Sequence, residues 1–363
     1  MNMFRRFVFL FAALGALLCS CGGRRLGGDA GDVSEPAFLE ISDRPEGGWT
    51  AVSVSPFDGS RDTLVISKPM TSIVVMSTSH YGFLDALGRT DLIVGASGVD
   101  YIFDQAAAAK IPDVGYDSAP DYERIVALGP EVVLTYAVSG AKSQFVSRLE
   151  QLGIKVFTVN EHLERHPLAR ATYIRLFGAL SGEMEAADSI LAEVKANYTA
   201  IADTVKKAGT PPRKVLLNIP YNDQWFVPAA DNYLTEMITD AGGTVLGCES
   251  GKTASTVMSV EKAYSLSKEA DCWLNVGWCR TMEQLEGVNP IFHDMVKNIS
   301  ANAAGLGILG SPVVWNDNKR VNAKGGNDIW QSGVARPDLV LRDLASILRC
   351  AGAYETIYYE PIY

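Results

Sequence analysis

Aromatic and polar side chains follow several short apolar runs in this sequence. Stretches such as Ser72–Met76 and Cys272–Val276 lead into segments that carry hydroxyl, imidazole and indole groups. Aromatic faces around a few polar groups suit a large, partly apolar ligand such as a metal chelate or a macrocycle. The candidate ligand-binding residues are Ser77, Thr78, Ser79, His80, Tyr101, Tyr116, Tyr136, Trp225, Trp278, Arg280, Trp315 and Trp330.

Among these candidates, the imidazole of His80 could serve the largest number of roles. It could ligate a haem iron, donate to an oxyanion or cap a helix, and Tyr136 is the other candidate for an axial haem ligand. Ser77, Thr78 and Ser79 precede a helix start, a placement that can also hold an anion. The ligand class therefore stays open between a siderophore, haem, a corrinoid and a molybdate-type oxyanion.

The sequence supports binding of a bare metal ion, or catalysis, less well than binding of a chelate or macrocycle. His162 and His166 share helical spacing, but the sequence HLERH lacks the HE start of a zinc helix, so we expect an exposed or capping pair. With His80 and His293 the only other histidines, a bare-metal receptor is an alternative without a full ligand set. The sequence contains no GxSxG, P-loop or HExxH motif, so we expect no enzyme and no intrinsic cofactor. A cell-envelope hydrolase or chelatase-like enzyme remains the alternative of another class.

Charge and length narrow the class of protein further. The 363 residues carry 32 Lys and Arg against 42 Asp and Glu, a net charge of −10, which argues against a broad nucleic-acid surface. A chain of this length predicts about two domains.

The N-terminus is typical of an exported chain. Two arginines precede the apolar run Phe7–Leu18, which is too short to span a bilayer. Leu18-Cys19-Ser20-Cys21 resembles the bacterial lipoprotein box, with Cys21 as the lipidated residue. We therefore expect a signal peptide over 1–20 and a lipid anchor with a glycine-rich tether over 21–48. Which membrane holds the lipid stays open.

Cysteines of the exported chain could form disulfides. Four remain after processing, which allows two bridges in three connectivities. They are Cys248, Cys272, Cys279 and Cys350.

Two series of alternating apolar runs and helical segments predict an α/β fold with parallel sheets. We expect an N-terminal lobe over 49–180, which begins with a β-hairpin around Asp58-Gly59. A long amphipathic helix over 181–208 follows, because apolar residues recur there every three or four positions. A C-terminal lobe over 212–350 and a tail over 351–363 complete the chain.

This order of segments resembles the substrate-binding proteins of ABC importers for iron complexes, haem and cobalamin. The resemblance covers about Ser67 to Cys350. It is carried by the stretches Ser72–Ser97, Ile111–Tyr136, Leu149–Glu161 and Ser332–Leu348.

The resemblance implies two Rossmann-like lobes joined by one long α-helix, with the ligand cleft between them. It also implies that Glu123 and Glu261, one on each lobe, dock onto arginines of a permease whose ATPase drives transport. The expected function is a lipid-anchored protein on the periplasmic side of the membrane, or on the outer membrane, that delivers an iron or cobalt complex. A receptor for bare metal ions or oxyanions is the alternative.

Overall fold

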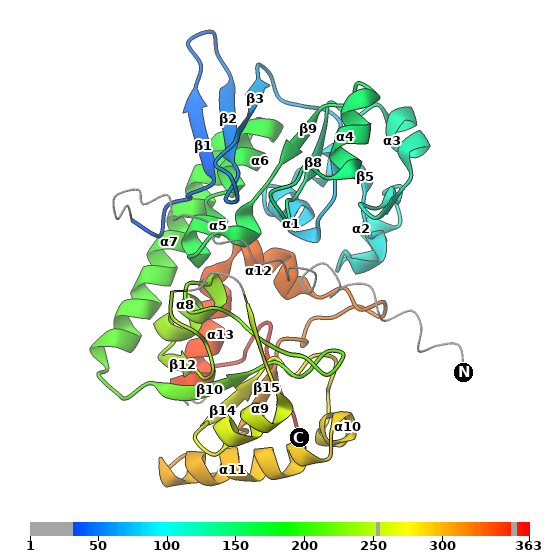
Figure 1. Cartoon of the computed structure of the whole chain (residues 1–363). Helices are drawn as coiled ribbons and strands as arrows, with labels where there is room; N and C mark the ends of the chain where they lie inside the picture. The colour runs from blue at the N-terminus through cyan, green and yellow to red at the C-terminus, as the bar shows by residue number, and fades with distance from the viewer. Residues whose placement is uncertain (1–31, 252–254, 350–353) are drawn as a thin grey trace.

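Two lobes lie one above the other in the computed structural model, which describes residues 32–251, 255–349 and 354–363 (Figure 1). A four-stranded parallel sheet forms the centre of the N-terminal lobe, in the order β5-β4-β8-β9. The strands are short and apolar, and β4 and β8 are buried along their whole length. Their bounds are β4 Ile73–Val75, β5 Ile93–Ala96, β8 Val132–Thr135 and β9 Val156–Thr158.

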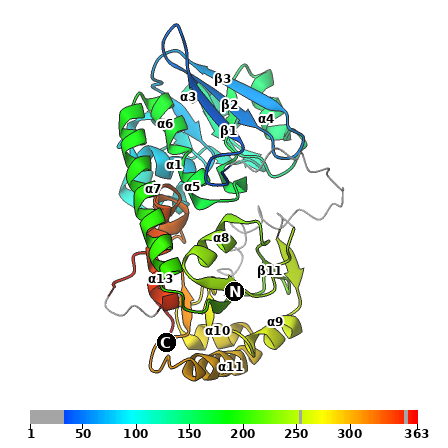
Figure 2. The same ribbon diagram turned by 90° about the vertical axis from the view of Figure 1, so that its left-hand side faces the viewer.

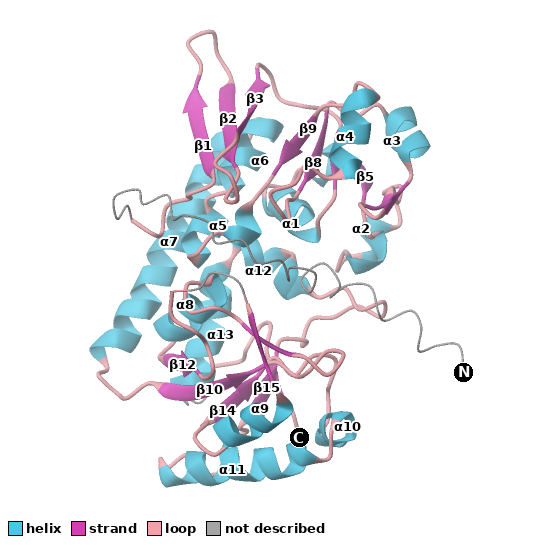
Figure 3. Cartoon of the chain, in the orientation of Figure 1, coloured by secondary structure: helices cyan, strands magenta, loops and turns pink. Residues whose placement is uncertain are grey.

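Helices alternate with these strands, as the sequence predicts for a parallel sheet (Figure 3). Side-chain oxygens at Ser77, Asp121 and Ser143 cap α1, α3 and α4, respectively. The helices of this lobe are α1 Thr78–Ala86, α2 Gln105–Ala108, α3 Tyr122–Leu128, α4 Gln144–Gln151, α5 Pro167–Ala171 and α6 Ile174–Ser181. A small hairpin joins β6 (Gly115–Tyr116) to β7 (Ala119–Pro120).

The leading hairpin is present as β2 (Trp49–Val54) and β3 (Arg61–Ile66). A third strand, β1 (Leu39–Asp43), pairs with β2 inside the segment that we expected to be a tether. Leu39 is buried, and backbone N–H groups at Ala37 and Phe38 donate to the buried Glu164 carboxylate at 3.0 Å. The folded lobe therefore begins earlier in the chain than the sequence indicates.

The linking helix is α7 (Met184–Lys207), which runs along one side of both lobes (Figure 2). Gly182, at φ +81°, separates it from α6, so the helix starts later than Ser181. Its buried stripe packs against α6 and the closing helix α13 (Pro337–Arg349). The stripe consists of Ala187, Leu191, Val194, Tyr198 and Val205.

The C-terminal lobe holds a five-stranded sheet in the order β12-β10-β14-β15-β16. Its last strand comes from the segment expected to be a tail, and it pairs antiparallel to β15, so this sheet is mixed. The strands are β10 Arg213–Leu217, β12 Gly243–Val245, β14 Cys272–Leu274, β15 Val314–Asn316 and β16 Glu360–Pro361. A separate pair is β11 Trp225–Val227 and β13 Thr256–Met258. The helices are α8 Tyr233–Asp240, α9 Val260–Ser267, α10 Met282–Val288 and α11 Ile291–Gly305.

Residues 317–335, named here the crossing segment, lead from β15 back to the N-terminal lobe. The segment contains the short helix α12 (Ser332–Ala335), which packs against α1 at the centre of the molecule (Figure 1). Gly82 of α1 lies so close to the Gln331 carbonyl that a Cβ atom would clash with it. Across the described ranges, none of the helices has the length and apolar character that a membrane crossing requires.

Candidate functional site

Three tyrosines of the N-terminal lobe, Tyr101, Tyr116 and Tyr136, are named here the tyrosine rim. Tyr101 ends a 3-10 turn, Tyr116 is the last residue of β6, and Tyr136 directly follows β8. Gly98, at φ +60°, lies against two of the rings: a Cβ atom there would be 3.1 Å from Tyr116 Cε1 and 3.2 Å from Tyr101 Cδ2. The Tyr136 hydroxyl lies 3.5 Å from an Asp117 carboxylate oxygen. Burial, with the neighbouring Asp117, raises the pKa of Tyr136 to about 12. Burial and the nearby Tyr101 likewise raise the pKa of Tyr116 to about 12.

The C-terminal lobe contributes an exposed indole. Trp278 follows β14 and is 61% exposed. Arg280 is close by in the same loop, donates to the Asn318 carbonyl at 3.3 Å, and has Glu360 at 3.9 Å. Trp330 of the crossing segment is 38% exposed. Trp315 is half-buried and donates from Nε1 to the Pro312 carbonyl at 3.1 Å, so its indole N–H is already satisfied.

Backbone strain marks the ends of two strands in the C-terminal lobe. The non-glycine residues described with left-handed backbone are Asn218, Asn222, Asp223 and Asn275, after β10 and β14. Residues held in this region of φ tend to gather at functional sites. Asn218 is fixed there by donation from Nδ2 to the Phe226 carbonyl at 2.8 Å.

A polar group missed by the sequence analysis follows β15. Burial raises the pKa of Asp317 to about 6. Its neighbours Asn316 and Asn318 both donate to the Cys279 carbonyl, at 2.8 and 3.1 Å. The run Asn-Asp-Asn directly after an apolar strand was the signal that could have identified it.

The predicted ligand contact of His80 is wrong for the described conformation. The side chain is fully buried and faces Phe177, with ring centroids 5.9 Å apart, because α1 turns it into the lobe. Burial lowers its pKa to about 4. Ser79 is buried as well, and its hydroxyl donates to Glu161 at 2.7 Å. Ser77 and Thr78 are partly exposed, and Ser77 serves as the cap of α1.

The buried carboxylate Glu161 organises this interior. Burial opposes its ionisation, yet the partners His162, His80 and Arg170 prevail and hold its pKa well below the ordinary value. Its Oε2 atom lies 3.7 Å from His162 Nδ1 and 4.0 Å from His80 Nε2. His162 in turn contacts the Ala137 carbonyl at 3.0 Å, directly beside Tyr136. This polar chain joins the lobe interior to the tyrosine rim.

The predicted contact of Trp225 with a ligand is also wrong. The side chain is fully buried, 5.8 Å from Trp273 and 5.7 Å from Phe292 between ring centroids. Its Nε1 atom donates to the Leu217 carbonyl at 2.7 Å. Pairing of β11 with β13 folds the indole into the core of the lobe, which sequence position alone does not reveal.

The expected histidine pair is split between two roles. His166 caps α5 by accepting at Nδ1 from the Leu168 N–H at 3.0 Å, whereas His162 bonds to the loop after β8. His166, Glu236 and Asp240 are close enough to hold a metal ion. However, an acceptor at Nδ1 places the proton of neutral His166 on Nε2, so the atom nearest Asp240, at 3.9 Å, has no free lone pair. These three residues do not fit a metal site.

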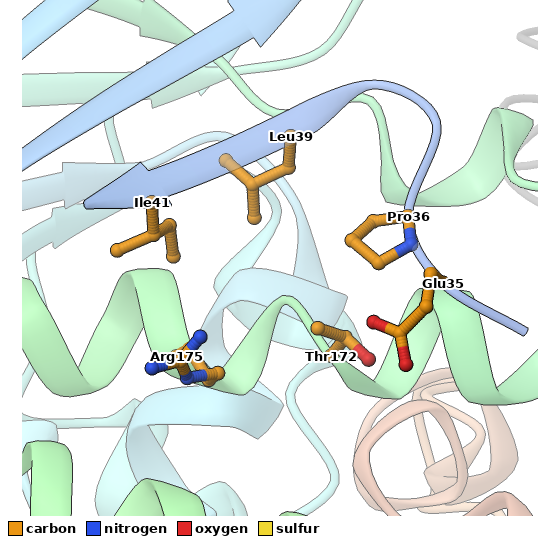
Figure 4. A pocket seen from close by; sticks show the side chains of 6 residues that line it. All are labelled: Glu35, Pro36, Leu39, Ile41, Thr172 and Arg175. Atoms are coloured by element: carbon orange, nitrogen blue, oxygen red, sulfur yellow. The ribbon is translucent and has the colours of Figure 1, made fainter.

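Two hollows of the surface are lined by residues outside the set of ligand-binding candidates. One, of about 250 Å³, lies between β1 and the helices α5 and α6, where Leu39 and Ile41 face Arg175 (Figure 4). Arg175 is paired there with Asp188 at 2.6 Å. The other, of about 370 Å³, lies beside Glu261 and Asn289.

The two carboxylates expected to dock a permease are exposed in the first turns of α3 and α9, one on each lobe. A hydrogen bond with Ser259 lowers the pKa of Glu261, which keeps it charged.

Cys248 and Cys279 are free thiols, whereas Cys350 and the lipidation candidate Cys21 lie outside the described residues. A bridge between Cys248 and Cys279 is therefore not formed.

The chain is similar to known proteins over much of its length. Residues 73–305 match the family described as periplasmic binding protein. An uncharacterized lipoprotein of Methanocaldococcus jannaschii is 26% identical over 302 residues, which cover 78% of this chain and 66% of that protein. A cobalamin-binding protein of Halobacterium salinarum is 24% identical over 198 residues, covering 54% of this chain and 52% of that protein. The matches thus span about half to two thirds of these relatives.

Solved structures share the architecture. A periplasmic haem-binding protein from Pseudomonas aeruginosa has a TM-score of 0.57 at 15% identity, covering 81% of this chain and 98% of its own. A periplasmic vitamin B12-binding protein of Vibrio cholerae has a TM-score of 0.57 at 15% identity, covering 79% and 99%. At these identities the likeness supports the fold, and the predicted α/β class with two lobes is confirmed.

Proposed function

Because the chain belongs to the periplasmic binding protein family, we propose that it captures a corrinoid between its lobes and delivers it to an ABC importer. The tyrosine rim, Trp278 and Trp330 would supply the aromatic surface for the macrocycle. It acts as a binding protein, without catalysis and without an intrinsic cofactor. Its partners are then a permease and the attached ATPase.

The choice of ligand rests on one observation: the Arg and Lys side chains near these aromatic residues are already paired with carboxylates of the protein. Arg280 faces Glu360, Arg320 pairs with Asp328 at 2.7 Å, and Lys324 pairs with Asp100. An anionic ferric siderophore or the propionates of haem would compete with these carboxylates for every one of those cations. A corrinoid, which needs mainly aromatic and neutral hydrogen-bonding groups, would not.

Axial ligation of haem has little support from the candidate ligands. His80 is enclosed in the lobe, and the hydroxyl of Tyr136 already lies 3.5 Å from an Asp117 carboxylate oxygen. The relative from Halobacterium salinarum that is described as cobalamin-binding supports the same choice. We further propose that Cys21 carries a lipid that holds the exported protein at the membrane, as the name of the Methanocaldococcus relative suggests.

The test is a binding experiment with three probes. The soluble form that begins at Gly22 is titrated with cyanocobalamin, with haemin and with a ferric hydroxamate siderophore, by calorimetry and absorption spectroscopy. We expect tight binding of cyanocobalamin alone. A Soret shift with haemin, or a charge-transfer band retained with the siderophore and no corrinoid binding, would contradict the proposal. Hydrolysis of a test ester without binding of any probe would support an enzyme instead.

A further inference from the structure

The crossing segment bridges the lobes through one asparagine. Asn322 donates from Nδ2 to two carbonyls of the N-terminal lobe, Asp100 at 3.2 Å and Ile102 at 2.8 Å. These carbonyls flank Tyr101, the first residue of the tyrosine rim. One side chain of the C-terminal lobe therefore contacts the backbone on both sides of a residue in the other lobe.

The other end of the same amide fixes its own turn. Asn322 Oδ1 accepts from the Lys324 N–H at 2.8 Å and from the Gly326 N–H at 2.9 Å, and its own N–H donates to the Gly326 carbonyl at 2.9 Å. These bonds within the turn fix the orientation of the Asn322 amide, so its Nδ2 atom points toward the carbonyls of the other lobe. Gly326 fits closely, since a Cβ atom there would be 2.5 Å from the Tyr101 carbonyl.

Further contacts surround this bridge. Lys324 pairs with Asp100, and the Arg320 guanidinium lies 4.8 Å from the centre of the Phe103 ring. Gln331 accepts from the Phe103 N–H at 2.9 Å. The exposed ion pair contributes little by itself. The hydrogen bonds of Asn322 to the Ile102 carbonyl and of Gln331 to the Phe103 N–H are partly buried and define the geometry, whereas the bond of Asn322 to the Asp100 carbonyl is exposed.

We propose that Asn322 is a positioning residue that holds Tyr101 in its ligand-contacting place from the opposite lobe. The bridge ties the backbone on both sides of Tyr101 to the crossing segment, so the position of Tyr101 depends on how the lobes sit against each other. The role in ligand binding rests on the proposed function, whereas the bridge itself does not. Loss of the bridge weakens corrinoid binding about tenfold, through Tyr101.

Asn322→Asp is the sharpest variant, because a carboxylate still accepts from the Lys324 and Gly326 N–H groups but cannot donate to the opposite lobe. Asn298→Asp is the matched control, since Asn298 Nδ2 donates to Ser267 within the C-terminal lobe, at 3.1 Å. Hydrogen exchange is measured on ligand-free protein. We expect Asn322→Asp to speed exchange of the amides of 99–103 at least about fivefold, and the control to leave them unchanged. Unchanged exchange in Asn322→Asp would overturn the bridge.

A double-mutant cycle then tests the route through Tyr101. Dissociation constants for cyanocobalamin are measured for the wild type, Asn322→Asp, Tyr101→Ala and the double variant. We expect Asn322→Asp to weaken binding about tenfold in the wild type and hardly at all once Tyr101 is truncated. Additive effects would overturn the positioning role. If the wild type does not bind cyanocobalamin, the proposed function and the effect on ligand fail, while the exchange result still decides the bridge.

Discussion

At the residue scale, Trp225, which begins β11, and Trp278, in the loop after β14, have opposite environments. Trp225 is enclosed by Trp273 and Phe292, whereas Trp278 is 61% exposed. We expect Trp225→Ala to lower the free energy of unfolding by roughly 3 to 5 kcal/mol, because it leaves a large cavity. Denaturation in urea measures this. An effect below about 1 kcal/mol would place Trp225 outside the core.

Trp278→Ala is the matched change at the surface. We expect its free energy of unfolding to stay within about 0.5 kcal/mol of the wild type. Its dissociation constant for cyanocobalamin should rise about tenfold, because an aromatic contact with the macrocycle is lost. Calorimetry measures this second effect. Unaltered affinity would remove Trp278 from the proposed site.

The buried His80 predicts how stability depends on pH. The unfolded chain takes up a proton near the ordinary histidine pKa of 6.5, whereas folded His80 remains neutral until about pH 4. The unfolded state therefore binds more protons in this window, and stability falls as the pH falls through it. Between pH 6.5 and 4.5 the contribution of His80 is roughly 2 kcal/mol.

His80→Leu should flatten this dependence, because it removes the titrating group and retains an apolar side chain of similar size. Urea denaturation at several pH values measures the slope. Phe83→Leu, which changes a buried side chain that packs on the same Phe177 ring and does not titrate, is the control and should keep the wild-type slope. A slope in His80→Leu equal to that of the wild type would contradict the assignment.

The sequence separates candidate residues by type and by the strand that they follow, but not by the direction in which they point. The sequence places both tryptophans after apolar runs, but Trp225 begins β11, whose pairing with β13 turns the side chain inward. His80 similarly begins a helix beside ligand-type residues, but the helix orientation buries it. Contacts far apart in the sequence, such as Asn322 with Ile102, carry no local signal.

At the element scale, local patterns identified most strands and helices. Apolar runs predict β4 and β14, and three-to-four spacing predicts α7, because these signals come from neighbours in the chain. Local patterns do not predict β1 and β16. Both are edge strands whose pairing depends on distant partners, β2 and β15, so their own residues give little indication.

The contact between α1 and the crossing segment gives an element-scale prediction. Gly82→Ala places a methyl group against the Gln331 carbonyl, and overpacking of this kind costs roughly 1 to 3 kcal/mol. Gly287→Ala is the matched control in α10, where the added Cβ meets nothing within 4 Å and helix propensity improves. We expect Gly82→Ala to lower the melting temperature and Gly287→Ala to keep or raise it. Equal melting temperatures would show that α12 shifts away from the added methyl group without loss of stability.

At the scale of the whole molecule, Glu123 and Glu261 lie exposed on different lobes, at the starts of α3 and α9. Two carboxylates on separate lobes can orient the protein on a receptor that carries complementary arginines. Neither belongs to the tyrosine rim or the crossing segment. Docking and ligand capture should therefore be separable.

We expect the double variant Glu123→Gln, Glu261→Gln to keep its affinity for cyanocobalamin and to abolish uptake by cells that carry the importer. Each single variant should reduce uptake partially, since one contact remains. Glu150→Gln, which changes an exposed carboxylate on α4 that pairs with Lys142, is the control and should transport normally. If the double variant loses its affinity for cyanocobalamin, these carboxylates support the fold or contact the ligand. If its uptake is normal, the permease recognises another surface. Because uptake and affinity are measured on the same variants, the two lobes can be assigned their docking role independently of the ligand that they hold.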